Sequence, residues 1–353
     1  MNIVVLIPAY KPEKRLVGYV DELASSGFGR IVVVDDGSGG GFKDIFDELE
    51  SMPFCSVLRH PSNRGKGVAL KTGLSHILEF HQDALGVLTA DADGQHVCED
   101  CIKVAQSVVE GDGAAVIGSR NFRFGRIPLR SWIGNRWSSL SLAIVLGRWI
   151  PDTQTGLRAF PMSILPMLIQ VGGQRYEYEM GVLMAMVRKG IPVATVPIRT
   201  IYEDGNASSH FSPLKDTIRI NRLVLADFFR FAGVSIASFV LDQGLAWGFA
   251  AALHMVGADV NGGIWLSGIA ARIVSSVFNF SLNRTFVFKS GGRIGTTAWK
   301  YALLCLLVIV ASNAGVTALV AAGMPRGAAK LICDILLYLV GYNVQSRFIF
   351  NGR

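Results

Sequence analysis

Several common signatures are missing from this sequence. Its five cysteines include one C-x-x-C pair, Cys98 and Cys101, which is half of a zinc site, so neither metal nor redox chemistry is expected there. No G-x-G-x-x-G follows the first apolar run and no Walker A loop occurs, which argues against a dinucleotide cofactor and a P-loop. The N-terminal MNIVVLIPAY lacks a basic leader region and is typical of a strand, so no cleavable signal is expected.

Charge is scarce in the last third of the chain. From residue 231 onward there are nine Lys or Arg and three Asp or Glu, whereas the remainder is nearly balanced, with 25 basic and 24 acidic residues. The mean hydropathy of +0.39 is high for a soluble protein. The net charge of +7 therefore belongs mainly to an apolar region, which indicates a membrane rather than a nucleic acid as partner.

Four apolar segments in this region are each close to the ~20 residues that a bilayer span requires. They lie near 232–255, 263–283, 299–322 and 328–346. Basic residues in the loop near 284–298 and after the last span predict that both termini are cytoplasmic, in the inner (cytoplasmic) membrane. The preceding segment, 212–231, suits juxtamembrane interfacial helices.

Asp242, Arg272 and Asp334 are charged residues that fall inside the predicted spans. We expect Arg272 to pair with Asp334 or Asp242, because an unpaired charge in a bilayer is costly. Such a pair would clasp the helices or line a polar path for a sugar-phosphate, and the clasp is favoured.

The first 230 residues alternate between apolar runs and amphipathic helical patterns. This order predicts an α/β domain with a mostly parallel sheet and helices on both faces. Ligands of such sheets bind outside the carboxyl ends of the strands. There the chain places IPAY, VDDGS, ADADGQ and GSR.

Two carboxylates in LTADADGQH, Asp91 and Asp93, follow a buried strand one residue apart. A divalent cation holding a phosphate would relieve their repulsion, although Asp and Gly are also turn residues. Asp35 and Asp36 can accept hydrogen bonds from a nucleoside, or one of them can cap a helix. Lys66 opens a helix between two glycines, where it would supply positive charge.

The segments IPAY, VVDDGS, NRGKGVALKTG, DADGQH, GSR and DTQTGLR, in this order, resemble a family 2 glycosyltransferase of GT-A fold. They are most similar to the branch with dolichol-phosphate mannose synthase and bacterial polyprenyl-phosphate sugar transferases. The membrane part resembles, more loosely, the four-span GtrA-like family. There the sequences NFSLNRTFVF and NVQSRFIF form a weak repeat. We expect a glycosyltransferase domain over 1–211, the interfacial segment 212–231, and an all-α transmembrane domain over 232–353.

The resemblance implies a site. Mg²⁺ or Mn²⁺ would be held by Asp91, Asp93 and Gln95. The donor nucleotide would be held by Pro8, Ala9, Tyr10, Asp35, Asp36, Lys66 and Asp91. The acceptor phosphate would be held by Arg120, Arg130, Arg136 and Arg158. The catalytic residues would be Asp93, Arg120 and Arg130.

The expected reaction is an inverting, metal-dependent transfer of a hexose from a UDP- or GDP-sugar to a polyprenyl phosphate. Processive polysaccharide synthases carry Q-x-x-R-W, whereas this chain has Ile133 in place of the glutamine, which argues against that activity. Two alternatives are a lipid-sugar transporter with a nucleotide-sugar-binding module, and a transferase with a non-lipid acceptor. The sequence leaves the sugar, the nucleotide and homo-oligomer formation open.

Overall fold

The computed structural model describes residues 1–353 except 112, 121–128, 200–212, 256–259 and 351–353, and it describes no side chains for 129–131, 213–217 and 260–264. The chain divides into two compact units, Met1–Val224 and Leu225–Arg353. Helix α8, Pro213–Met255, continues without interruption through this boundary and through much of the segment expected to be interfacial.

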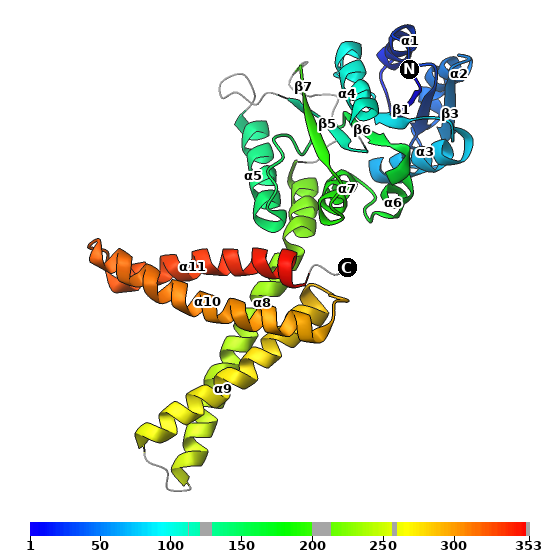
Figure 1. The fold of residues 1–353 in the computed structure, drawn as a ribbon. Coiled ribbons are helices and arrows are strands. Elements are labelled where there is room, and N and C mark those ends of the chain that lie inside the picture. The colour runs from blue at the N-terminus through cyan, green and yellow to red at the C-terminus, as the bar shows by residue number, and fades with distance from the viewer. Residues whose placement is uncertain (112, 121–128, 200–212, 256–259, 351–353) are drawn as a thin grey trace. The chain divides into compact units, whose positions relative to one another are not determined.

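A seven-stranded sheet organises the first unit (Figure 1). Its strands are β1 (Ile3–Ala9), β2 (Ile31–Asp35), β3 (Cys55–Arg59), β4 (Gly86–Thr89), β5 (Ala115–Arg120), β6 (Arg158–Pro161) and β7 (Val193–Ile198). The strand order is β3-β2-β1-β4-β6-β5-β7. β6 pairs antiparallel with both β4 and β5, and the other described pairs are parallel. The expected mostly parallel sheet is confirmed.

Helices cover both faces of this sheet. They are α1 (Arg15–Ser25), α2 (Lys43–Glu50), α3 (Lys66–Phe80), α4 (Cys98–Glu110), α5 (Leu129–Leu146), α6 (Leu165–Gln170) and α7 (Glu177–Arg188). Apolar residues of α1, α2 and α4 form one core with alternate residues of the central strands. The opposite face of β1 packs against α3, where a Cβ at Gly73 would lie 2.1 Å from a methyl group of Leu6. The close approach of α3 to the sheet therefore depends on this glycine.

The direction of the strands gathers the predicted polar segments. β1, β2, β4 and β5 run in one direction, so the residues that follow them share one edge of the sheet. Because β6 runs the other way, the segment that precedes Arg158 arrives at that same edge. One reversed strand thus brings the DTQTG sequence to the strand ends that carry the two aspartates.

The second unit is helical. Its further elements are α9 (Val260–Leu282), the π-helical segment η4 (Asn283–Val287), α10 (Ile294–Ala321), α11 (Arg326–Val344) and the π-helical segment η5 (Gln345–Ile349). Within the described residues, four helical stretches are long and apolar enough to cross a membrane, namely Ile218–Met255, Trp265–Val287, Ile294–Ala321 and Arg326–Ile349. Many large apolar side chains on them are exposed, as expected for helices that face lipid. The chain is a membrane protein.

The weak sequence repeat corresponds to a structural one. Both copies pass from α-helix into a π-helical segment, η4 in the first and η5 in the second. The amide of buried Asn283 donates to Oε1 of Gln345 at 3.2 Å, and the rings of Phe288 and Phe350 stack with centroids 5.4 Å apart. The two copies therefore contact one another at the ends of their spans.

Arg272 and Asp334 each have an oppositely charged partner within the candidate spans. Arg272 lies 3.3 Å from Oδ2 of Asp242, which confirms one of its two predicted partners. Asp334 instead pairs with Lys330, four residues earlier on α11, at 2.7 Å. Spacing of four residues places these two side chains on one face of the helix.

Candidate active site

A cleft of about 800 Å³ lies at the carboxyl edge of the sheet. The predicted donor residues that line it are Pro8, Ala9, Tyr10, Asp36, Lys66 and Asp91, whereas Asp35 is not part of the lining. Asp93, predicted as a metal ligand, lines it as well. Arg15 and Arg175 add positive charge to its wall. The cleft is large enough for a nucleotide-sized ligand and carries both signs of charge.

Lys66 joins two carboxylates in this cleft. Its ammonium lies 2.6 Å from Oδ1 of Asp91 and 3.1 Å from Oε2 of Glu179 on α7. Burial alone would lower the pKa of Lys66, but the charges of Asp91 and Glu179 outweigh this effect and raise it. Burial would likewise raise the pKa of Asp91, but Lys66 and His96 hold it well below its usual range. Lys66 and Asp91 are therefore both charged at neutral pH.

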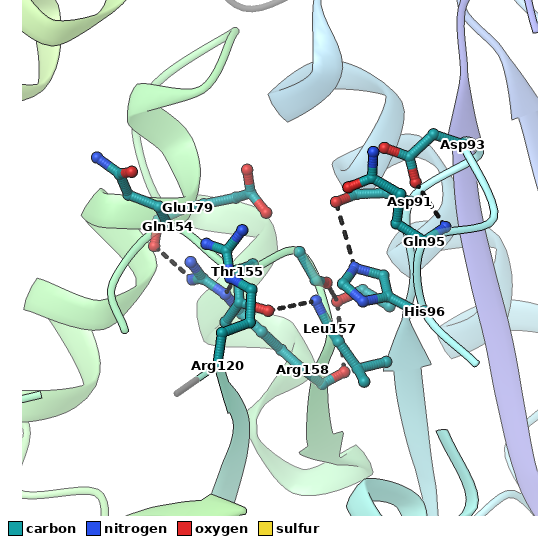
Figure 2. A network of polar contacts seen from close by, with 12 residues as sticks. Asp91, Asp93, Gln95, His96, Arg120, Gln154, Thr155, Leu157, Arg158 and Glu179 are labelled. Atoms are coloured by element: carbon teal, nitrogen blue, oxygen red, sulfur yellow. Dashed lines mark hydrogen bonds and ion pairs between the residues drawn. The ribbon is translucent and has the colours of Figure 1, made fainter. Parts of the chain in front are cut away.

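The surroundings of Asp93 shift its pKa in the opposite direction from that of Asp91. Its pKa is raised, first by burial and then by the negative charge of Asp91. Asp93 accepts a hydrogen bond from the backbone N–H of Gln95 at 3.1 Å, and His96 lies 3.4 Å from the other oxygen of Asp91. Figure 2 shows Asp91, Asp93 and Gln95 grouped together, with Glu179 reaching toward them from the neighbouring helix. Asp93 therefore has negative charge close by and would gain from an added cation.

The two aspartates and the glutamine fit a hard divalent cation. Carboxylate and amide oxygens are ligands that Mg²⁺ and Mn²⁺ prefer. Within the described residues, no three His, Cys, Asp or Glu side chains are grouped as a complete metal site. A cation here would therefore take its remaining ligands from a bound diphosphate and water, as Mg²⁺ commonly does.

The DTQTG sequence builds the wall beside Asp91. A Cβ on Gly156 would lie 2.3 Å from Oδ2 of Asp91, so only glycine leaves room for this carboxylate. Asp152 is fully buried and accepts from Nε and Nη2 of Arg120 at 2.7 and 3.1 Å. Asn135 on α5 ties the segment down through the carbonyl of Pro151 and the backbone N–H of Thr153. The segment thus shapes the surroundings of Asp91 and orients Arg120.

Asp35 and Asp36 hold the loops at the ends of the strands. Asp36 is buried and accepts from the backbone N–H groups of Arg64 and Gly65 and contacts Nδ1 of His60 at 2.8 Å. Asp35 accepts from the backbone N–H of Ser38 at 2.8 Å. Their hydrogen bonds within the protein are loop-stabilising, and a role toward the nucleoside stays a prediction.

The glycines on either side of Lys66 allow close packing of the chain on itself. A Cβ on Gly65 would lie 2.5 Å from the carbonyl oxygen of Gln174, and one on Gly67 would lie 2.6 Å from Cβ of Tyr178. Gly65 also has φ +98°, a conformation that favours glycine. These contacts place Lys66 next to Glu179, and Gly65 also lines the cleft.

The predicted acceptor arginines lie in unlike surroundings. Arg158 is buried, and its guanidinium donates to the backbone carbonyls of Thr155, Glu179 and Thr153 at 2.9, 2.7 and 3.1 Å. Arg136 is exposed on α5, near the rings of two tryptophans. Arg130 belongs to α5, but its side chain lies outside the described part. The surroundings of Arg158 are those of a structural residue, and contact with an acceptor stays a prediction for all of these arginines.

Sequence reasoning left several functional partners unassigned. In the structure Glu179 contacts Lys66, whereas Glu177 accepts from the backbone N–H groups of Gln174 and Arg175 at the start of α7. Neither His96 nor Asp152 was assigned a role. The sequence pointed to them only through their position: His96 ends the DADGQH motif and Asp152 begins the DTQTGLR motif, and both motifs already contained assigned residues.

Cys98 and Cys101 are buried in α4 and unpaired. Burial raises the pKa of Cys98 to about 11 and that of Cys101 to about 12. Both thiols stay protonated and unreactive at neutral pH, which is consistent with a structural role.

Comparison with known proteins agrees with this geometry. Residues 4–166 match the model of glycosyl transferase family 2, and residues 255–350 match that of the GtrA/DPMS transmembrane domain. A UDP-N-acetylglucosamine–dolichyl-phosphate N-acetylglucosaminyltransferase from Methanococcus voltae is 33% identical over an alignment of 219 residues, which covers 57% of this chain and 86% of that protein.

Two more distantly related proteins also align with more than half of this chain. A dolichyl-phosphate beta-glucosyltransferase from Trichomonas vaginalis is 30% identical, over 57% of this chain and 66% of its own. The solved structure of glucosyl-3-phosphoglycerate synthase from Mycobacterium tuberculosis has 18% identity and a TM-score of 0.47, over 64% of this chain and 76% of its own. Because the Methanococcus voltae relative aligns over most of its length and the family model also matches, the chain belongs to glycosyl transferase family 2. It is a glycosyltransferase with a GtrA/DPMS-type transmembrane domain.

Proposed function

We propose that the chain transfers a hexose from a UDP- or GDP-sugar to a polyprenyl phosphate at the cytoplasmic face of the membrane, with inversion at the anomeric carbon. The observation that carries this proposal is the Asp91–Asp93 pair beside Lys66, in the lining of a nucleotide-sized cleft, in a chain whose described residues contain four candidate spans. The names of the Methanococcus voltae and Trichomonas vaginalis relatives support a lipid phosphate as the acceptor.

The donor would lie along the ends of β1 and β4. Pro8, Ala9 and Tyr10 line the cleft on one side and would contact the nucleoside. Asp91, Asp93 and Gln95 would hold Mg²⁺ or Mn²⁺, and when bound this ion supplies charge neutralisation for the leaving nucleoside diphosphate. Lys66 keeps Asp91 ionised and fixes the direction of its carboxylate.

The acceptor needs orientation more than activation. A phosphate monoester has a second pKa near 6, so its oxygen is largely ionised at neutral pH and attacks without a strong general base. In the proposed step this oxygen forms a bond to the anomeric carbon while the bond to the diphosphate oxygen breaks and takes the electron pair. Arg120, with its orientation fixed by buried Asp152, would bind the acceptor phosphate.

Helix α5 carries features of a membrane-interface helix. Ile133, Trp137 and Leu140 are large apolar side chains that it exposes, and Arg136 is exposed among them. Aromatic and aliphatic side chains beside a cation suit the boundary between headgroups and acyl chains. We propose that α5 brings the lipid acceptor to the arginines at the sheet edge.

The test is transfer by the purified full chain in detergent. Undecaprenyl phosphate, Mg²⁺ or Mn²⁺ and a panel of radiolabelled UDP- and GDP-sugars would be incubated with wild type, Asp93→Asn and the matched control Asp21→Asn, whose carboxylate is exposed on α1. We expect an organic-extractable product from one donor, lost about 100-fold or more in Asp93→Asn and on addition of EDTA, and unchanged in Asp21→Asn.

Other outcomes would change the proposal. Metal-dependent nucleotide binding without transfer from any donor would favour a transporter with a binding module, or an acceptor outside the panel. Retention of configuration in the product, measured from the coupling constant of its anomeric proton, would contradict the single displacement.

A further inference from the structure

A second cavity, of about 880 Å³, lies between α9 and α10 in the membrane unit. Along α9 its lining extends from Trp265 to Phe280, which is ~22 Å at ~1.5 Å per residue. Along α10 it extends from Ala298 to Cys305. Most of the lining is apolar, so the shape and surface suit a hydrocarbon chain rather than a compact polar ligand.

One full charge enters this groove. Arg272 lines it and lies within the candidate span Trp265–Val287, yet 71% of its side chain is exposed. Among the described residues its guanidinium has a single ion pair, with Oδ2 of Asp242 at 3.3 Å. Asp242 is buried, and its other oxygen accepts from Ser275. Asp242 therefore anchors Arg272 from behind and leaves most of the guanidinium fork toward the groove.

Lys330, another cation within a candidate span, has fuller contacts. Lys330 on α11 contacts Asp334 at 2.7 Å and donates to the hydroxyl of Ser312 at 3.0 Å, and it lies four residues after the start of its helix. Lys330 thus has an acceptor on its own helix and another on α10. Exposed guanidinium donors at depth in a bilayer are costly unless an anion contacts them, and this cost applies to Arg272 far more than to Lys330.

We infer that the groove between α9 and α10 is a binding site for a polyprenyl phosphate, with the phosphate on Arg272 and the isoprenoid chain along the apolar lining. The choice of lipid rests on the proposed function, which makes this lipid class the acceptor. Arginine binds phosphate through paired, charge-assisted hydrogen bonds, and a single long chain fits an elongated groove. The site is separate from the donor cleft, since their linings share no residue.

Photoaffinity labelling of the full chain in nanodiscs tests this site. A polyprenyl phosphate with a diazirine in its chain would be cross-linked to wild type, Arg272→Met, Arg272→Lys and the control Lys330→Met, and the labelled peptides would be identified by mass spectrometry. We expect labelling within 265–305 to fall roughly tenfold in Arg272→Met, to persist in large part in Arg272→Lys, and to be unchanged in Lys330→Met.

Competition on wild type supplies a test that does not depend on a variant's folding. Excess undecaprenyl phosphate should suppress the labelling of 265–305, whereas undecaprenol, with the same chain and no phosphate, and phosphatidylglycerol should not. Equal suppression by either control lipid, or full labelling of well-folded Arg272→Met, would overturn the inference and show a general lipid-facing surface.

A transfer assay on the same preparations separates the two proposals. Sugar transfer by wild type without phosphate-dependent labelling of 265–305 would overturn only the groove site. Phosphate-dependent labelling without transfer from any donor would overturn only the proposed reaction.

Discussion

The two units of this chain treat polar groups in opposite ways. In the catalytic unit full charges are brought together and partly buried, as in the contact of Lys66 with Asp91 and Glu179. In the membrane unit the buried polar contacts are largely between neutral groups, as in the hydrogen bonds of Asn279 with Ser238 and Tyr301. The difference shows that polar groups shielded from water are stabilised in two ways, by ion pairs in the first unit and by neutral hydrogen bonds in the second. A transfer site requires charge at a fixed place, whereas a bilayer offers no solvent to polar atoms that are left without partners.

The largest expected effect comes from breaking the charged network. Lys66→Met would leave Asp91 and Glu179 close together without their shared cation, so we expect a loss of about 3 kcal/mol in the free energy of unfolding. Urea denaturation followed by tryptophan fluorescence would measure it. The double variant with Glu179→Gln should recover part of the loss, and equal losses in the single and double variants would contradict a charge network.

A steric change tests the same region without altering any charge. Gly156→Ala would force the Asp91 carboxylate from its position, because the added Cβ would lie 2.3 Å from Oδ2. We expect a roughly tenfold or greater loss of sugar transfer. The matched control is Gly18→Ala on α1, where the added Cβ meets nothing within 4 Å. That variant should retain full activity and gain slightly in melting temperature.

In the membrane unit the corresponding change should cost less. Asp242→Asn removes the ion pair with Arg272 but keeps an oxygen that can accept from Ser275. We expect a loss of about 1 kcal/mol, since interactions between transmembrane helices are individually modest. Unfolding in mixed micelles of increasing sodium dodecyl sulfate fraction would measure it, and a loss as large as that of Lys66→Met would remove the contrast between the units.

The smallest effect is expected at the protein surface. Arg30 and Asp83 form a two-point ion pair at 2.7 and 2.8 Å, and both side chains are solvent-exposed. Water and salt screen such a pair, so Asp83→Asn should leave the melting temperature of the chain unchanged within error. A clear drop at low and high salt alike would show that exposed pairs also contribute to this fold.

Sequence patterns were sufficient for the local structure. Apolar runs and helical periodicity predicted the parallel sheet, the four spans and the edge at which Asp91 and Asp93 lie, because these features depend on neighbouring residues. The resemblance to family 2 glycosyltransferases was confirmed for the same reason, since its motifs are short and contiguous. The pairing of Lys330 with Asp334 could also have been predicted from their spacing of four residues on one helix. Our prediction overlooked it and offered Asp334 as a partner of Arg272.

The tertiary structure decided which distant side chains meet. The reversed strand β6 brings Gly156 against Asp91 and buries Arg158 among backbone carbonyls. The packing of two glycines places Lys66 beside Glu179, and the contact of α8 with α9 gives Arg272 its partner Asp242. Composition and periodicity determine where charges are available, but contacts between residues far apart in the chain depend on strand direction, register and the space left by packing.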